Sequence, residues 1–421
     1  MDERQLREAL TDAASRYEPD VRSARRFVAM HQERPSPRGS TRRTWGAALL
    51  AGVLVVGVAV FAFVVLGDTS DDAPTSASVG TGPSAPVGTA NLSDLNFFDA
   101  SNGLALDKQC VAPGASDASC ELQVVATSDG GTTWTPVSEP LHVGYPGWRG
   151  YPFVQFATNG KDGWIYGNRT FATHDGGNTF VEEDLGGTVV SLSMGPESTW
   201  MVVNPCAPAQ QCASSVYTTP TVGGTATPLT GAPQLQSFSV ELLRPSRDHA
   251  LLSASGSGAL SVTVDAGRTW VSRTMPPLCG QLHHVSAVTP QDVFVVCSNA
   301  SPTRAQDKEL YTSDDDGASW SLVSTSGNGG SLPEEGLVAL FVAVSPDQLW
   351  MSFNRGPLIG SQDGGATWAS AMIPELDATD DTDVHSVQQL TFSNASRGWA
   401  VVPPDLYRTT DGITWKRVGG A

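Results

Sequence analysis

Three patterns of hydrophobic and polar positions divide the chain. Residues 3–18 carry apolar side chains at a spacing of three to four, which predicts an amphipathic helix, and a second short helix is expected after Asp20. Residues 46–66 form a run of 21 residues without a charged side chain. From residue 92 onward, short apolar runs are separated by turns rich in Gly and Pro, which predicts an all-β domain of about 330 residues.

The charge-free run has the length of a membrane-spanning helix, since about twenty apolar residues cross the hydrocarbon core of a bilayer. The charged residues that flank it are Arg38, Arg42, Arg43, Asp68, Asp71 and Asp72. Arginines precede the run and aspartates follow it, so the positive-inside rule places the N-terminus in the cytoplasm and the C-terminal region outside. A cleaved signal peptide is the alternative, but its short charged lead contrasts with the 45 residues found here. We expect a single-pass cell-membrane protein with a helical cytoplasmic tail at 1–45 and a transmembrane helix at 46–66.

The segments on either side of the predicted anchor differ in composition. Residues 67–91 consist mainly of Ser, Thr, Ala, Pro and Gly without periodic apolar positions, which predicts a flexible linker. Two short helices bury little core by themselves, so residues 3–31 have two interpretations. They are either a solvated or membrane-surface tail, or a docking segment for a cytoplasmic partner.

An eight-residue pattern, S/T-x-D-x-G-x-T-W, recurs through residues 92–421. The copies are TSDGGTTW at 127–134, THDGGNTF at 173–180, TVDAGRTW at 263–270, SDDDGASW at 313–320, SQDGGATW at 361–368 and a shortened TTDGITW at 409–415. Successive aspartates are separated by 46, 90, 50, 48 and 48 residues. The 90 is a double step, and a degenerate copy at 219–226 lies inside it, with Thr221 in place of Asp. Seven copies of about 47 residues match the four-stranded blades of a β-propeller.

The pattern resembles the Asp-box, or BNR repeat, of the sialidase superfamily, and the resemblance covers the whole of residues 92–421. It implies a seven-bladed β-propeller in which each box is the hairpin between the third and fourth strands of a blade. A carboxylate in such a turn accepts backbone N–H bonds, and Gly supplies the positive φ, so we expect a structural role for the box aspartates. They are Asp129, Asp175, Asp265, Asp315, Asp363 and Asp411. A second mark supports the same assignment of strands within each repeat. An apolar or aromatic residue opens each second strand: Leu104, Trp164, Trp200, Ala250, Phe294, Trp350 and Trp399.

The net charge disfavours some classes of binding partner, and the cysteine content indicates the cellular compartment. The net charge is −18, yet residues 1–45 hold ten Arg against seven Asp or Glu, so the remainder carries −21. Such an acidic domain repels nucleic acid and anionic lipid. All six Cys follow residue 100, which indicates disulfides in an oxidising compartment. The local pairings Cys110–Cys120, Cys206–Cys212 and Cys279–Cys297 would each staple one blade; metal binding is the alternative, but the spacings match no known ligand set.

The crossing from blade 1 to blade 2 holds the first candidate ligand site. Trp148 is the one Trp that neither a box, a second strand nor the membrane interface explains. With Tyr145, Arg149 and Tyr151 it makes an aromatic and cationic platform of the kind that stacks on sugars or holds a peptide. The alternative interpretation is a loop that packs on the rim of the propeller.

Two further groups are candidate ligand residues. The crossing from blade 6 to blade 7 holds Asp380, Asp381, Asp383 and His385, which suit Ca²⁺ in ligand type but not in the spacing of an EF-hand, so a solvated acidic loop is the alternative. His283 and His284 open blade 5 near the predicted central channel. Adjacent strand residues face opposite sides, so the two do not readily share a metal. We predict no metal site and no cofactor, with Ca²⁺ as the one exception considered.

Three protein families have a similar repeat, and each has its own sequence requirements. Sialidases need an arginine triad, a Tyr nucleophile and an early F-R-I-P stretch, and this sequence lacks that signature. Xyloglucan-cleaving glycosidases of similar repeat pair two propellers around a cleft and use two carboxylates, whereas one propeller is expected here. Single Asp-box propellers similar to the photosystem II assembly factor family bind proteins or peptides. We therefore expect an extracytoplasmic binding protein for a protein, peptide or glycan, with no catalytic residues assigned; the alternatives are a cell-surface glycoside hydrolase and a transmembrane sensor.

Overall fold

The computed structural model describes most of the C-terminal domain. The described residues are 87–111, 118–145, 153–195, 197–206, 212–220, 224–237, 239–299, 306–327, 329–354, 356–373, 376 and 386–418. The predicted tail, the predicted span at 46–66 and most of the predicted linker lie outside them. Among the residues that are described, no helix has the length and apolar character needed to cross a membrane.

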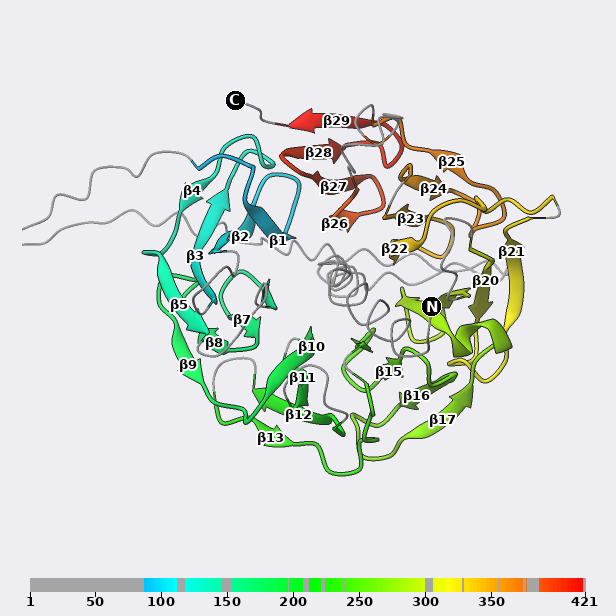
Figure 1. The fold of residues 1–421 in the computed structure, drawn as a ribbon, viewed down its shortest axis with the longest axis horizontal. Helices are drawn as coiled ribbons and strands as arrows, with labels where there is room; N and C mark the ends of the chain where they lie inside the picture. Colours follow the sequence, from blue (N-terminus) through cyan, green and yellow to red (C-terminus); the bar gives the residue numbers. More distant parts are fainter. Residues whose placement is uncertain are drawn as a thin grey trace, which may run out of the picture. The chain divides into compact units, whose positions relative to one another are not determined.

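Seven antiparallel sheets form a ring, which confirms the predicted all-β, seven-bladed propeller (Figure 1). Blade 1 consists of β1 (Leu92–Phe97), β2 (Gly103–Val111), β3 (Ala118–Thr127), β4 (Thr135–Pro136) and β5 (Leu141–Tyr145). Blades 2 and 3 consist of β6 (Val154–Thr158), β7 (Gly163–Gly167), β8 (Thr170–Thr173), β9 (Val181–Glu183), β10 (Thr188–Met194), β11 (Ser198–Asn204), β12 (Ser215–Pro220) and β13 (Thr227–Pro228).

The remaining four blades each have four strands. Blades 4 and 5 consist of β14 (Val240–Leu243), β15 (Ala250–Ala254), β16 (Ala259–Thr263), β17 (Val271–Thr274), β18 (Leu282–Ala287), β19 (Val293–Ser298), β20 (Lys308–Ser313) and β21 (Ser321–Thr325). Blades 6 and 7 consist of β22 (Val338–Ala343), β23 (Leu349–Phe353), β24 (Ile359–Ser361), β25 (Ala369–Ser370), β26 (Gln389–Asn394), β27 (Arg397–Val402), β28 (Asp405–Thr409) and β29 (Trp415–Val418). A short 3₁₀ helix, η3 (Pro277–Gly280), precedes blade 5.

The first strand of each blade lies at the centre of the ring. These strands contact one another in the order β1, β6, β10, β14, β18, β22 and β26, and β26 returns to β1 (Figure 1). Every sheet is built from strands that are consecutive in the chain. Within the described residues, the ring therefore closes between blades 7 and 1 through side chains, and no strand is shared by the two ends.

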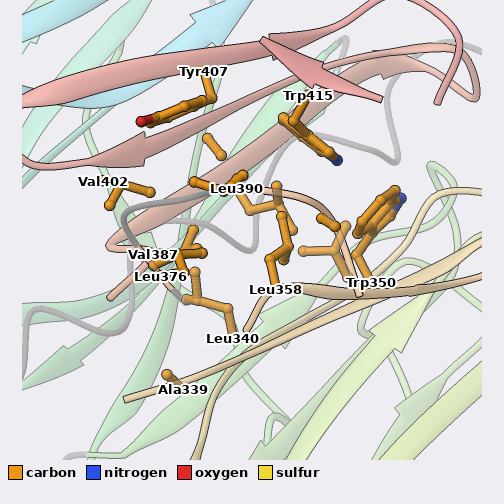
Figure 2. Close-up of a cluster of buried hydrophobic side chains, with 14 of the residues drawn as sticks. Ala339, Leu340, Trp350, Leu358, Leu376, Val387, Leu390, Val402, Tyr407 and Trp415 are labelled. Atoms are coloured by element: carbon orange, nitrogen blue, oxygen red, sulfur yellow. The ribbon is translucent and has the colours of Figure 1, made fainter. Parts of the chain in front are cut away.

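The hydrophobic core lies between neighbouring blades. All seven residues predicted to open second strands are buried, with exposed fractions of 7 % or less. Figure 2 shows the cluster between blades 6 and 7, where the Trp350 and Trp415 rings meet edge to face with centroids 5.3 Å apart. Each blade turns one apolar face to each neighbour, so burial requires the complete ring.

Blade 1 differs from the expectation of four strands. β4 pairs only with Val125 and Ala126 of β3, and β5 pairs with the other half of the same strand, from Ala118 to Leu122. β3 has ten residues, so a two-residue β4 leaves a long edge of unpaired backbone groups that β5 satisfies. The crossing that follows blade 1 thus begins as part of the sheet.

Candidate functional site

The six box aspartates hold turns together. In five of them, one carboxylate oxygen accepts from the Thr or Ser hydroxyl two residues earlier and from the N–H four residues later, as at Asp265, where both distances are 2.8–2.9 Å. The other oxygen accepts from the hydroxyl four residues later. Asp411, in the shortened copy, accepts from the N–H groups of Ile413 and Thr414 instead. These carboxylates are occupied by their own turns.

The same hydrogen bonds hold the aspartates in the charged form. At Asp265, the N–H and hydroxyl of Thr269 lower the pKa to about 2. At Asp129, burial raises the pKa, but the hydrogen bonds from Thr133 and Thr127 outweigh it, and the net pKa is lowered. The pKa is also below its ordinary value at Asp175, Asp315, Asp363 and Asp411. A depressed carboxyl pKa suits a structural acceptor and not a general acid.

The turns and the connections between first and second strands share one face of the ring, which we name the turn face. The turn N–H of Gly130 donates to Ser101 O at 2.9 Å, and that of Gly176 donates to Lys161 O at 2.8 Å. Blades 4 and 6 repeat this bond at Ala266 and Gly364. The opposite face, the loop face, carries the connections between second and third strands and the crossings between blades.

All three disulfides are on the loop face, and the predicted pairings are confirmed. Cys110–Cys120 joins the end of β2 to the start of β3, and Cys206–Cys212 joins the residues that follow β11 to those that precede β12. Cys279–Cys297 ties η3, in the crossing from blade 4, to β19. The cross-links therefore hold loops at blades 1, 3 and 5 on the face where the crossings lie.

The platform predicted on the first crossing is only partly described. Tyr145, at the end of β5, is 5 % exposed and packs among the apolar side chains between blades 1 and 2, so it is a core residue and not a ligand contact. Trp148, Arg149 and Tyr151 lie outside the described residues. Arg169 supports β5 from blade 2, since its guanidinium donates to Gly144 O at 3.2 Å and to both oxygens of Glu182.

The two histidines of blade 5 face different partners, as expected for adjacent strand residues. Nδ1 of His283 lies 2.8 Å from Cys279 O, and the side chain is 2 % exposed. His284 reaches both neighbouring blades: Nδ1 lies 3.5 Å from Oε1 of Glu241 in blade 4, and Nε2 lies 3.2 Å from Val338 O in blade 6. His284 therefore links the inner strands of three blades, and the two rings do not converge on a shared metal.

The predicted acidic site lies outside the described residues, since the structure does not describe Asp380, Asp381, Asp383 or His385. Leu376, which precedes them on the same crossing, is described and is buried between blades 6 and 7. Within the described part of the chain, no group of three or more His, Cys, Asp or Glu side chains could hold a metal ion.

Sequence reasoning missed a buried lysine that fixes another crossing. Nζ of Lys308 donates to the carbonyl oxygens of Gln306, Pro333 and Glu334, each at 2.9 Å, and the residue is 1 % exposed. Burial lowers the pKa of Lys308 to about 8. A single Lys at the start of a strand gives no sequence signal of this role, because two of its three acceptors lie 25 and 26 residues away.

Comparison with known proteins supports the fold. No protein-family model and no curated protein matches the chain. The structure of YCF48 bound to a D1 peptide is 19 % identical, with a TM-score of 0.51 over 82 % of this chain and 99 % of that one. YCF48 from Cyanidioschyzon merolae is 16 % identical, with a TM-score of 0.50 over 78 % and 99 %. The GH74 xyloglucanase from Xanthomonas campestris is 12 % identical, with a TM-score of 0.52 over 80 % of this chain but only 55 % of the enzyme. At these identities the shared feature is the seven-bladed propeller.

Proposed function

We propose that the propeller is a binding module of the Asp-box type, held on the outer surface of the cell membrane by residues 46–66, and that it takes a protein, peptide or glycan on its loop face. The observation that carries this proposal is the concentration of all three disulfides on that face. Cross-linked loops lose less conformational entropy when they bind. On the turn face, by contrast, the aspartates are engaged in hydrogen bonds within their own turns.

A peptide is the ligand class that the comparisons favour. The similar propeller YCF48 has been solved bound to a D1 peptide. The identity of 19 % does not carry that ligand over to this chain, and the charge of −18 on residues 92–421 favours a ligand with basic residues.

The experiment compares three forms of the full chain in uncharged detergent against peptide and glycan arrays. The first is wild type, the second carries Trp148→Ala and Arg149→Ala on the predicted platform, and the third carries Val264→Ala and Arg268→Ala on the turn face, where both residues are exposed. We expect the platform variant to lose binding at an unchanged Tm and the control to retain it. Equal binding by all three would contradict the platform and support rim packing.

Glycoside hydrolysis is the second candidate, and one buried carboxyl favours it. Asp107 on β2 is 6 % exposed, and burial raises its pKa. A raised pKa is the property of a general acid, although hydrolysis also needs a second carboxylate facing it. Release of reducing sugar from xyloglucan by wild type, and its loss in Asp107→Asn, would establish this function.

A further inference from the structure

A cavity of about 440 Å³ lies where the outer strands of blade 7 meet the aspartate turn of blade 1. Its lining residues are Thr132, Arg408, Thr410, Asp411, Thr414, Lys416, Arg417 and Val418. Blade 1 contributes Thr132, and blade 7 contributes all the others, from its aspartate turn and from β28 and β29. The cavity therefore extends from the aspartate turn of blade 7 along its outer strands, and none of its lining residues belongs to the disulfide-linked loops of the loop face.

The charge of the lining is opposite to that of the domain. Three cations face one carboxylate, Asp411, in a domain, residues 92–421, that carries −18. The Asp411 carboxylate already accepts hydrogen bonds from Thr409, Ile413 and Thr414. Arg417 is paired with Asp405. The cavity lining therefore keeps a net positive charge.

The two remaining cations are held against each other. Arg408 on β28 and Lys416 on β29 are direct cross-strand partners, and like charges at such positions destabilise a sheet. The Arg408 guanidinium is fixed by contacts of 3.4 Å to Asp129 O and Gly130 O. Among the described residues, the Lys416 ammonium has no ion-pair partner. The sheet thus tolerates a repulsive pair at the wall of a cavity, and a bound anion would relieve that repulsion.

The donors reach the cavity from several directions. Cations line it from two strands, and Thr132, Thr410 and Thr414 line it from two turns. The hydroxyl of Thr132 donates to Asp129 O and that of Thr414 bonds to Asp411, so the donors that remain are those of Thr410 and the cations. Donors placed around a centre suit a tetrahedral oxyanion better than a planar carboxylate, and Lys binds phosphate as a point charge. We propose that this cavity binds a phosphate group carried by a small molecule or by a lipid headgroup.

The position of Val87 makes a lipid headgroup one of the two sources of the phosphate group to distinguish. The backbone N–H of Val87, the first described residue, donates to Trp134 O at the end of the blade 1 aspartate turn. Val87 therefore lies beside the turn that contributes Thr132 to the cavity.

The test is calorimetric titration of the full chain, in uncharged detergent and at low ionic strength, with two probes. Inorganic phosphate represents a soluble source, and glycerophosphoglycerol represents the headgroup of an anionic lipid. We expect saturable binding by wild type and a loss of about tenfold in affinity in Lys416→Gln, because a charge-assisted hydrogen bond is removed. The matched control is Lys161→Gln, which removes an exposed charge from the turn face of blade 2.

Stability separates binding from a structural role of Lys416. Since Lys416→Gln removes a like-charge pair, its Tm without phosphate should equal or exceed that of wild type. Phosphate should raise the Tm of wild type and of Lys161→Gln by more than that of Lys416→Gln. Tighter binding of glycerophosphoglycerol than of phosphate assigns the site to a headgroup, and the reverse order assigns it to a soluble phosphate. Absence of saturable binding by wild type, or an equal loss in both lysine variants, would overturn the proposal without affecting the loop-face function.

Discussion

At the scale of single residues, two of the aspartate turns lack the Gly that usually follows the aspartate. The residue after the box Asp has a positive φ, and it is Gly in four of the six turns, but Ala266 and Asp316 occupy that position in blades 4 and 5 with φ of 57° and 58°. An L-residue in this conformation is strained, although Gly costs more entropy in the unfolded chain.

Ala266→Gly should therefore stabilise the protein by about 0.5–1 kcal/mol, because relief of strain exceeds the entropic loss. Urea unfolding measures the change. The control is Ala318→Gly, three residues after a box Asp and outside the positive-φ set, which should destabilise by a similar amount. Destabilisation by both substitutions would show that the strain is not significant.

The aspartate turns also predict the acid limit of stability. A carboxyl whose folded pKa is depressed contributes stability above its unfolded pKa, and that contribution disappears as the pH falls through the folded value. For Asp265 the window extends from the ordinary value of 3.8 down to about 2. The free energy of unfolding of wild type should fall steeply from pH 4 to pH 2, and Asp265→Asn should be less stable at pH 6 with a shallower fall. Parallel curves for the two proteins would exclude this linkage.

At the scale of elements, the amine of Lys308 joins strand β20 to the crossing from blade 5 to blade 6. Lys308→Met would remove a donor from three carbonyl oxygens, two of them on the crossing from blade 5 to blade 6. Pro333 O would lose its one donor within the described residues, whereas Glu334 O keeps the N–H of Gln306 and Gln306 O keeps the hydroxyl of Ser326. Loss of buried hydrogen bonds to a charged group should cost about 3 kcal/mol, measured by urea unfolding. Lys161→Met, at an exposed position, should change stability by less than about 0.5 kcal/mol. Equal effects of the two would mean that the amine does not hold the crossing.

At the scale of the whole molecule, the ring depends on the junction of blades 7 and 1. The rings of Trp399 and Phe97 stack across it with centroids 3.5 Å apart, and Trp399 Nε1 donates to Gly130 O at 3.0 Å. Since no described strand spans this junction, these contacts link the two blades.

A pair of Trp→Phe substitutions isolates that hydrogen bond. Trp399 and Trp350 occupy equivalent second-strand positions and are equally buried, but the indole N–H of Trp350 has no hydrogen-bond partner within the described residues. Trp399→Phe should therefore cost about 1 kcal/mol more than Trp350→Phe in urea unfolding, since it alone removes a buried hydrogen bond and leaves Gly130 O with only the 3.4 Å contact to Arg408. A smaller loss at Trp399 would show that the junction is held by stacking alone.

Interactions between residues that are close in sequence could be predicted from the sequence. The box hydrogen bonds join residues no more than four apart, and the cysteine pairs are 6, 10 and 18 apart, so their spacing along the chain reports directly on structure. Periodic turns and buried second-strand residues together predicted the number of blades, because each blade is one consecutive segment. The membrane span and the acidic crossing remain predictions from the same kind of local pattern.

Other features were decided only by the tertiary structure. Tyr145 has the residue type of a ligand contact, yet β5 places it in the core because β3 has a long unpaired edge. The partners of His284, Lys308 and Trp399 lie 43, 25 and 269 residues away, and the sequence alone does not indicate which groups the ring brings together. The sequence by itself determined the repeating unit, since turn and strand chemistry act within a few residues. Closure of the ring decided the sites between blades, because burial and pairing across it depend on where distant segments meet.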